Sequence, residues 1–405
     1  MTRSPTVCWV LVNSVPYHEA RISAAARRPP LRLSVIQLTS EDAFPILQQQ
    51  VGAQEAENLP RKTLFSNIPQ KQIGGQALVE RLHAALDELH PSAVCINGWS
   101  FGGGIAALAW CLSRKVPAIM MSESTAGDET RYWWKEAIKR RVVGLCSASL
   151  VGGSPHRQYL ATLGAPVDRV FMGYDAVDNE HFCRGAERAR RSDERLRAVL
   201  KLPKRYFMSC SRFSKKKNLF RLLHAYARYL REAPSDPWSL VMVGDGELRE
   251  ELIACRDRLG LKEQVLLPGA KSYRELPTFY ALAGAFVHAS TVEQWGLVVN
   301  EAMAAGLPVI VSNRCGCASD LVLPGVNGFL FDPFDIGELA GLMRDVSSET
   351  FDRQAFAEAG QQIVARWSPK RFAEGLAGAV ETACRATLPT PNAVDRLLVW
   401  MLRHR

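Results

Sequence analysis

Two glutamates, Glu293 and Glu301, stand on either side of Gly296, where the chain is expected to pass from a loop into a helix. The apolar run at residues 285–290 predicts a buried strand, and residues 297–305 have helical composition. Two glutamates near a helix start are, taken alone, more often solvated than functional. A strand, a loop and a helix in this order give them a context in which a ligand can bind.

The start of this helix predicts a seat for phosphate. The first N–H groups of a helix have no partner within it, and they lie at the positive end of the helix dipole. The amides around Gly296, Leu297 and Val298 are such groups. Glu301 lies one turn deeper on the same face as Leu297, where a carboxylate can accept both hydroxyls of a ribose. Glu293, just before the phosphate seat, is expected to meet the group that the phosphate carries.

A second segment supplies positive charge. Arg212 follows an apolar strand expected at residues 206–210, and the triplet at residues 215–217 precedes Asn218, a candidate cap for the next helix. Ligands bind at the carboxyl ends of strands in parallel α/β sheets. Arg212 as a planar fork and Lys217 as a compact charge would together suit a diphosphate. A lysine triplet alone is more often a solvated loop or a nucleic-acid contact.

The elements that must hold these residues alternate between strand and helix. This alternation predicts an α/β fold with parallel sheets covered on both faces. In the first half, apolar strands are expected at residues 7–12, 33–38, 93–97, 117–121 and 149–152. In the second half, they are expected near residues 206, 240, 265, 286, 309 and 329. A chain of 405 residues with 47% hydrophobic residues is long enough for two such domains.

Several ordered motifs resemble the retaining nucleotide-sugar glycosyltransferases of family 4, the group 1 glycosyltransferases. The Arg212 and Lys217-Asn218 pair resembles one family signature, and Glu293, Glu301 and the following Ala-Met-Ala-Ala-Gly-Leu-Pro-Val resemble another. Residues 240–246, 265–269 and 324–332 also match in type and order. The resemblance is strong over most of residues 200–370. It implies the GT-B fold, in which two Rossmann-like, doubly wound domains face each other across a cleft.

The resemblance implies a reaction and a set of roles. The enzyme would move a sugar from a nucleoside-diphosphate sugar to a saccharide, lipid-linked or small-molecule acceptor, with retention at the anomeric carbon. Arg212, Lys217 and the amides of Gly296, Leu297 and Val298 would bind the donor phosphates, Glu301 the ribose and Glu293 the sugar. No cofactor and no metal would be required. No nucleic-acid partner is expected. A nucleotide-sugar binder without turnover is an alternative that the motifs alone leave open.

The first domain departs from the family pattern. The stretch after the first strand, residues 13–21, lacks the Gly-Gly turn that many members have there. Glu123 stands where those members carry a histidine after the fourth strand, so it either replaces that residue in catalysis or caps the segment that follows. His18 and Arg21 are candidate contacts for the acceptor. Their alternative is an ordinary start of a surface helix.

Four parts are expected along the chain. Residues 1–183 would form the acceptor-binding domain, residues 184–200 a charged linker, and residues 201–367 the nucleotide-sugar-binding domain. Residues 368–405 would form helices that pack back on the first domain. The segment 173–182 resembles the element that ends the first domain in the family.

The cysteines and the apolar runs of the sequence indicate the cell compartment. The ten cysteines are scattered, and the close pair Cys315 and Cys317 lacks the spacing of a zinc site, so a reducing cytoplasm is expected. No run of residues is long and apolar enough for a secretion signal or a membrane span.

The net charge of +9 is unevenly placed. Residues 101–231 hold 25 Lys and Arg against 11 Asp and Glu, which favours anionic ligands. Residues 131–141 mix aromatic rings and cations, as helices resting on anionic lipid do, and residues 396–405 are also basic and apolar. Peripheral contact with the inner face of the membrane is therefore one interpretation, and ordinary helix packing is the other.

One motif points to a different enzyme class. Gly98-Trp-Ser-Phe-Gly102 lies between an expected strand and an expected helix, as in the nucleophile elbow of an α/β-hydrolase with Ser100 as nucleophile. Candidate partners follow in the required order: Asp128 with His156, or Asp178 with His181. This interpretation leaves residues 200–370 without a role, and glycine-rich turns are frequent in doubly wound sheets.

Overall fold

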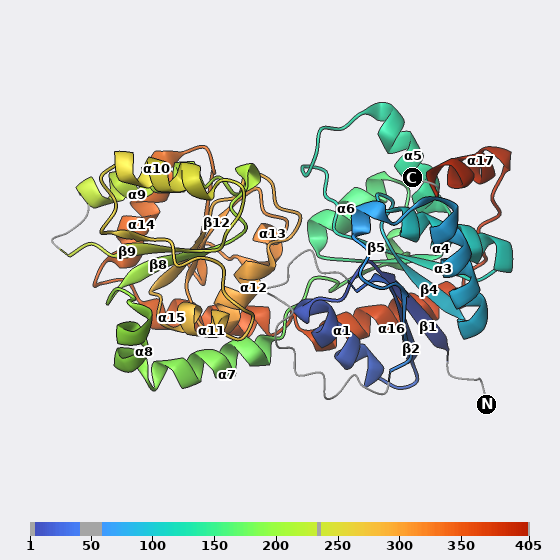
Figure 1. The fold of residues 1–405 in the computed structure, drawn as a ribbon, viewed down its shortest axis with the longest axis horizontal. Coiled ribbons are helices and arrows are strands. Elements are labelled where there is room, and N and C mark those ends of the chain that lie inside the picture. Colours follow the sequence, from blue (N-terminus) through green and yellow to red (C-terminus); the bar gives the residue numbers. More distant parts are fainter. Residues whose placement is uncertain (1–4, 41–58, 233–235, 404–405) are drawn as a thin grey trace. The chain divides into compact units, whose positions relative to one another are not determined.

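The computed structural model describes residues 5–40, 59–232 and 236–403. The chain divides into two compact units. The first contains residues 1–176 and 369–405, and the second contains residues 177–368. Each unit is a parallel sheet with helices on both faces, so the α/β, doubly wound class predicted from the sequence is confirmed (Figure 1).

The first unit has a seven-stranded parallel sheet in the order β3-β2-β1-β4-β5-β6-β7. The strands are β1 (Thr6–Leu11), β2 (Arg32–Thr39), β3 (Arg61–Phe65), β4 (Ala93–Asn97), β5 (Ala118–Ser122), β6 (Ala148–Val151) and β7 (Val170–Met172). The helices are α1 (Pro16–Ala26), α3 (Gly75–Leu89), α4 (Gly102–Arg114), α5 (Trp133–Gly144), α6 (Ser154–Thr162), α16 (Pro369–Arg385) and α17 (Ala393–Leu402), with short 3₁₀ turns at Gln70–Gln72 and Val167–Arg169. The predicted strands are all present, and β3 and β7 are additional.

Alternate residues of each strand in this sheet enter two different cores. Val10, for example, packs with α3 and α4, whereas Trp9 packs with α1 and α16 on the other face. Because helices cover both faces of the sheet, the strands are mostly apolar along their length and do not alternate between apolar and polar residues. Figure 1 shows α1 and α16 side by side on one face. Helix α16 is held there by Phe372, whose ring stacks on Trp9 at 5.2 Å.

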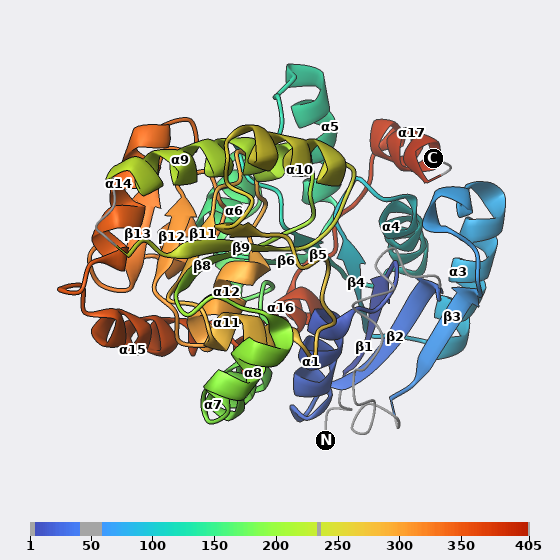
Figure 2. The same ribbon diagram turned by 60° about the vertical axis from the view of Figure 1, so that its left-hand side comes forward.

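The second unit has a six-stranded parallel sheet in the order β10-β9-β8-β11-β12-β13. The strands are β8 (Tyr206–Cys210), β9 (Ser239–Val243), β10 (Val265–Leu266), β11 (Ala285–His288), β12 (Val309–Ser312) and β13 (Gly328–Phe331). The helices are α7 (Asn179–Arg190), α8 (Asp193–Leu200), α9 (Leu219–Glu232), α10 (Arg249–Arg258), α11 (Leu276–Ala281), α12 (Leu297–Ala304), α13 (Ala318–Leu321), α14 (Ile336–Ser347) and α15 (Arg353–Val364), with a 3₁₀ turn at Lys215–Lys217. Figure 2 shows α9 and α10 on one face of this sheet and α11 and α15 on the other.

Residues 184–200 are not a linker. They lie in α7 and α8, within the second unit. Phe182, Ala186 and Ala189 are buried at helical spacing while the charged residues of α7 face outward. A side chain at Gly185 would lie 2.5 Å from Pro277 of α11, so a glycine is required for the two helices to pack this closely. High charge in this segment therefore marks the outer face of a helix.

Candidate functional site

The sheet of the second unit brings the two predicted segments together. The chain leaves β8 toward β9 and β10 on one side, and it returns to β11, which pairs with β8 on the other side. The carboxyl ends of β8 and β11 therefore flank the point where the strand order reverses, which is where ligands bind in such sheets. Arg212 and Lys217 follow β8, and Glu293 and Gly296 follow β11.

The turn after β8 is a 3₁₀ turn that aims Lys217 at the neighbouring loop. Asn218, which ends the turn, has a positive φ of 59° and is buried. Its backbone carbonyl accepts from the Leu222 amide at 3.2 Å at the start of α9. Its side chain anchors the turn, because Nδ2 donates to the Pro333 carbonyl at 2.7 Å and Oδ1 accepts from the Arg221 guanidinium at 3.1 Å. The Thr291 amide donates to the Lys216 carbonyl at 2.9 Å, which joins this turn to the loop after β11.

The loop after β11 ends at Gly296, whose φ of 105° is one that other residues rarely adopt. It caps α12, so the amides that follow begin the helix as predicted. The loop is fixed from its other side: the Gly316 amide donates to the Glu293 carbonyl at 3.0 Å, and the Cys317 amide to the Trp295 carbonyl at 3.1 Å. The backbone at the helix start is therefore held in place before any ligand arrives.

Glu293 is the centre of a small polar network. Its Oε2 forms an ion pair with the Lys217 ammonium, and it lies 3.1 Å from both the His288 Nε2 and the Ser290 Oγ. The side chains of Lys217 and Glu293 are only 13% and 12% exposed. Within the described part of the chain, Oε1 of Glu293 accepts no hydrogen bond.

Protonation in this network follows from burial and pairing. Burial lowers the pKa of His288, and its hydrogen bond with Glu293 offsets only part of this, so the ring is neutral and donates through Nε2. Burial raises the pKa of Glu293, but the His288 hydrogen bond and the Lys217 charge outweigh it and hold this pKa well below its usual range. Glu293 is therefore ionised at neutral pH and faces a cation at the start of a helix.

Two further predicted residues differ in exposure. The Arg212 side chain is exposed and forms no ion pair with any residue that the structure describes. Glu301 is fully buried, and its Oε2 accepts from the Tyr280 hydroxyl at 2.7 Å. A ribose can reach Glu301 only by displacing a contact that covers it now.

Sequence reasoning missed His288, Ser290 and Tyr280 as members of this site. His288 and Ser290 were included in the apolar run that predicted β11. A histidine and a serine at the carboxyl end of an otherwise apolar strand were the available signal, because polar side chains there point toward the ligand edge of the sheet.

In the first unit, Arg21 belongs to a cluster with Tyr174 and Ala176 at the carboxyl edge of the sheet. Glu123 follows β5 and is partly exposed. Arg21, the other candidate acceptor contact, is 1% exposed, so it does not lie on the surface of a helix start. Its Nε donates to the Ala176 carbonyl at 2.9 Å, and its guanidinium lies 5.0 Å from the Tyr174 ring centroid.

His18 lies near this cluster on α1. Its Nδ1 accepts from the Val15 amide at 3.4 Å, and its ring packs edge-on against Trp9. Burial of the ring, followed by the charge of Arg21, lowers the pKa of His18 to about 3. His18 is therefore neutral, with its proton on Nε2.

The hydrolase interpretation finds no support in this geometry. Ser100 is exposed between β4 and α4, and it is absent from the described residues with a positive φ, whereas a nucleophile elbow is strained. The candidate partners are used elsewhere: Asp128 accepts from the Thr125 amide and pairs with Arg131, and Asp178 caps α7. Across the described ranges, no group of three or more His, Cys, Asp or Glu side chains is arranged to hold a metal ion.

Comparison with known families identifies the second unit. The sequence model described as "Glycosyl transferases group 1" matches residues 191–363, which is nearly all of that unit. Residues 191–363 of this chain are therefore similar to the group 1 glycosyl transferases. The resemblance proposed from the motifs is confirmed.

Curated proteins extend the comparison. The chain is 26% identical over 347 residues to a D-inositol 3-phosphate glycosyltransferase of Mycolicibacterium smegmatis, covering 81% of this chain and 76% of the relative. It is 36% identical over 103 residues to an alpha-monoglucosyldiacylglycerol synthase of Streptococcus pneumoniae, covering 25% of this chain and 23% of that protein. It spans only 20% of the length of the Salmonella typhi protein VipC/TviE, at 35% identity over 121 residues and 30% of this chain.

Solved structures agree on the GT-B fold of this chain. Anabaena HepE, in complex with UDP and glucose, matches with a TM-score of 0.71 at 19% identity, covering 92% of this chain and 98% of that one. A glycosyltransferase from Rickettsia africae matches with a TM-score of 0.74 at 14% identity, covering 95% and 99%.

Proposed function

We propose that this protein transfers a sugar from a nucleoside-diphosphate sugar to an acceptor, with retention at the anomeric carbon. The observation that carries the proposal is the Lys217–Glu293 ion pair at the start of α12, next to the switch point of the second sheet. One cation, an ionised carboxylate and the first amides of a helix gather at one place. Such a set can hold a diphosphate and orient the sugar attached to it.

The donor half of the reaction falls to the second unit. Lys217 and Arg212, with the amides of Gly296, Leu297 and Val298, stabilise the charge that grows on the diphosphate as it leaves. Binding of the diphosphate draws Lys217 partly away from Glu293, and the free Oε1 of Glu293 accepts a sugar hydroxyl. Glu301 accepts hydrogen bonds from the ribose hydroxyls once the Tyr280 hydroxyl that contacts it is displaced. The complex of HepE with UDP and glucose supports a donor of this class.

The acceptor half falls to the first unit. Glu123 is partly exposed at the carboxyl edge of that sheet and serves as a further catalytic carboxylate, and neutral His18 is a candidate contact for the acceptor. Arg21 is buried, so we assign it a structural role beneath these groups. The acceptor is a saccharide, a lipid-linked saccharide or a small molecule.

The proposal is tested with a panel of nucleotide sugars. Purified protein is incubated with each donor, with and without saccharide and lipid acceptors, and the released nucleoside diphosphate is measured. One donor is expected to give release above background, and the anomeric configuration of the product, read by proton NMR, is expected to match the donor. Release from no donor contradicts the proposed activity, and an inverted product contradicts retention.

We further propose that the first unit rests on the surface of an anionic membrane. No helix in the described residues is long and apolar enough to cross a bilayer. Twelve large apolar side chains are exposed in the described residues, and seven of them lie in α17 or at the start of α5. They are Tyr132, Trp133, Trp134, Val394, Leu397, Trp400 and Met401. Apolar side chains gathered in this way are typical of a binding surface.

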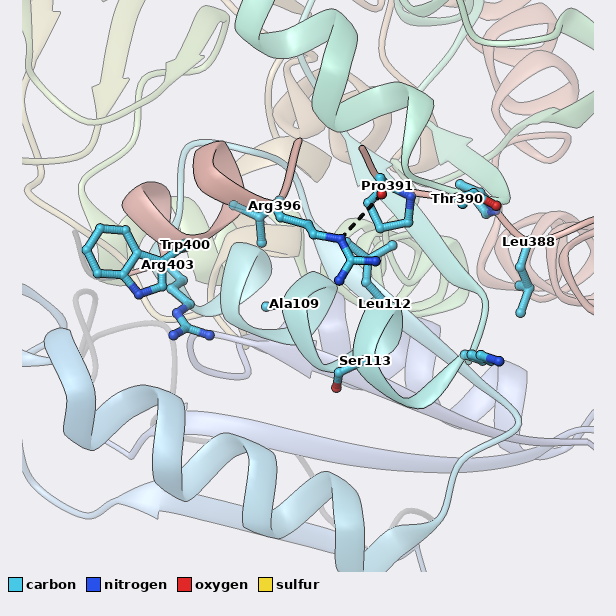
Figure 3. Close-up of a pocket in the computed structure, with 12 residues that line it drawn as sticks. Ala109, Leu112, Ser113, Leu388, Thr390, Pro391, Arg396, Trp400 and Arg403 are labelled. Atoms are coloured by element: carbon cyan, nitrogen blue, oxygen red, sulfur yellow. Dashed lines mark hydrogen bonds between the residues drawn. The ribbon is translucent and has the colours of Figure 1, made fainter. Parts of the chain in front are cut away.

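Cations accompany these side chains. The Lys135 ammonium lies 5.1 Å from the Tyr132 ring centroid, and the Arg141–Asp395 ion pair joins α5 to α17 at 2.8 Å. Figure 3 shows a pocket beside α17, with Arg396 and Arg403 among its lining residues; its volume is about 440 Å³. Aromatic rings with interspersed cations suit the boundary between lipid headgroups and acyl chains.

Vesicle flotation tests this contact. The wild-type protein is expected to float with vesicles containing phosphatidylglycerol and to remain behind with pure phosphatidylcholine. Trp133→Ser combined with Trp400→Ser is expected to lower flotation at least tenfold. Val199→Ser is the control, because Val199 is 71% exposed on α8 of the second unit. Equal flotation of the double variant and the control contradicts the assignment of this surface.

A further inference from the structure

The two oxygens of the Glu293 carboxylate have different surroundings. Oε2 is in contact with three donors: the Lys217 ammonium, the His288 Nε2 at 3.1 Å and the Ser290 Oγ at 3.1 Å. A carboxylate oxygen has about two lone pairs, so three donors leave it no capacity for another hydrogen bond. Oε1 accepts from none of the residues that the structure describes. One oxygen is therefore fixed by the protein, and the other is left for a ligand.

The end of β11 supplies two of these donors. His288 is the last residue of the strand, and Ser290 follows two positions later. Residues two apart in an extended chain point to the same side, and the Ser290 Oγ lies 3.2 Å from the His288 Nε2. The His288 ring stacks on the Phe286 ring, with centroids 6.2 Å apart and planes 13° from parallel. Because all three side chains are buried, packing fixes both donors before a ligand binds.

The proton of the neutral His288 ring must lie on Nε2. A bare Nε2 would place its lone pair against the ionised Oε2 of Glu293, which is repulsive. With the proton on Nε2, the ring donates to Oε2, and the Ser290 hydroxyl donates to the same oxygen. Both groups therefore stabilise the ionised carboxylate without adding a charge to the site.

Lys217 cannot hold Glu293 in the same way throughout the proposed reaction. A bound diphosphate carries more negative charge than one carboxylate, so it competes for the Lys217 ammonium. His288 and Ser290 are neutral and buried, so their hydrogen bonds to Oε2 persist when the ammonium moves. The start of α12 packs directly on this pair, because an added Cβ at Gly296 would lie 3.4 Å from Cγ of Glu293 and 3.7 Å from Nε2 of His288.

We propose that His288 and Ser290 are positioning residues for sugar transfer: together they hold Oε2 of Glu293 so that its Oε1 accepts a hydroxyl of the donor sugar. The inference rests on the function proposed above, because that function gives Glu293 a sugar to bind. It adds the groups that keep the carboxylate in place while Lys217 binds the diphosphate. Both residues act through Glu293 and do not touch the substrate.

Variants of His288 in the full-length enzyme test this role. His288→Ala removes the donor, and His288→Gln replaces the ring by an amide whose N–H group can reach Oε2. His288→Ala is expected to lower kcat/KM for the nucleotide sugar at least tenfold, while the Kd of the nucleoside diphosphate, which has no sugar, stays within threefold. His288→Gln is expected to be at least fivefold more active than His288→Ala. Equal inactivity of the two variants, with the Kd weakened as much as kcat/KM, would assign His288 to the fold alone and overturn the inference.

Ser290 is tested against a matched serine. Ser347 is buried in α14; its hydroxyl accepts from the Tyr229 hydroxyl at 3.2 Å and donates to the Arg344 carbonyl at 3.0 Å. Ser347→Ala therefore loses two hydrogen bonds, neither of them with Glu293, and is expected to keep kcat/KM within twofold of the wild type. Ser290→Ala is expected to lower kcat/KM at least threefold. Equal losses in the two serine variants would contradict the role of Ser290.

Nitrogen NMR decides the direction of the His288 hydrogen bond without an activity measurement. The His288 signal, assigned by its loss in His288→Gln, is expected to show a proton on Nε2 at neutral pH. A proton on Nδ1 with a bare Nε2 refutes the inference.

Failure of the proposed function gives a different result. In that case the wild type releases no nucleoside diphosphate from any donor, whichever ring nitrogen of His288 carries the proton. An active wild type whose His288→Ala variant keeps kcat/KM within threefold overturns the positioning role and leaves the proposed function standing.

Discussion

Replacement of Lys217 by alanine separates the role of its charge in catalysis from its role in the fold. Lys217 forms an ion pair with Glu293, in the loop just before α12. A preorganised group that meets charge developing in the transition state contributes about 2–4 kcal/mol, so Lys217→Ala is expected to lower kcat/KM roughly a hundred- to a thousandfold.

The same change also affects stability. Loss of an exposed ion pair costs about 0–1 kcal/mol, and loss of one partner of a fully buried pair about 3–5 kcal/mol. The two side chains here are 13% and 12% exposed, so solvent screens the remaining charge in part. We expect Lys217→Ala to lower the free energy of unfolding by about 1–2 kcal/mol, measured by urea denaturation.

A double variant distinguishes the two effects. Lys217→Ala with Glu293→Gln removes the uncompensated carboxylate, while His288 and Ser290 can still donate to the amide oxygen. Stability is expected to recover to within about 0.5 kcal/mol of the wild type, while activity stays low. Lys216→Ala is the matched control, because Lys216 lies in the same turn but its side chain is exposed and only its carbonyl contacts the next loop. The reasoning is refuted if Lys217→Ala retains kcat/KM within threefold of the wild type, or if Lys216→Ala loses as much.

Three further changes test other parts of the account. Gly296→Ala places a side chain at a φ of 105° and is expected to lower stability by about 1–2 kcal/mol, measured by thermal denaturation. The control is Gly341→Ala inside α14, where an added side chain would meet nothing within 4 Å, and it is expected to raise stability by about 0.5–1 kcal/mol. Equal effects of the two changes would contradict the role of the glycine turn. The pKa of His18 is about 3 in the fold and about 6.5 when unfolded, so the unfolded chain binds the extra proton first and stability is lost as pH falls from about 6.5 toward 3. His18→Gln is expected to flatten this dependence of the free energy of unfolding on pH, measured by urea denaturation. An unchanged slope would count against a neutral, buried ring. Ser100→Ala is expected to leave nucleoside-diphosphate release within threefold of the wild type, and a loss of several orders of magnitude would revive the hydrolase interpretation.

The fold was largely predictable because its signals are local. Mostly apolar runs such as residues 206–210 and 93–97 form β8 and β4 with the expected bounds, since a strand buried on both faces is predominantly apolar. The short edge strands β3 and β7 were missed because an edge strand is partly solvated, and residues 61–63 are Arg-Lys-Thr. The sequence of α7 and α8 predicts a linker because both helices are rich in charge; the buried face of α7 is narrow, and α8 has no buried residue.

The site was predictable only in part. The loop around Gly296 and the two flanking glutamates have a recognisable spacing, whereas the burial of Glu301 under Tyr280 depends on packing between α11 and α12. The contact between Lys217 and Glu293 joins residues 76 positions apart, and that between Arg21 and Asp175 joins α1 to the end of β7. Neither contact produces a pattern in the sequence, so neither could be predicted without the three-dimensional structure.

The central claim is that the diphosphate of a nucleotide sugar binds at the carboxyl ends of β8 and β11. A crystal structure of the protein with the nucleoside diphosphate of its donor tests this most directly. The account predicts phosphate oxygens within hydrogen-bonding distance, about 3 Å, of the amides that begin α12 and of the Lys217 ammonium, with the Arg212 guanidinium turned toward them. A diphosphate bound at another edge of either sheet, with the Lys217–Glu293 pair untouched, would contradict it.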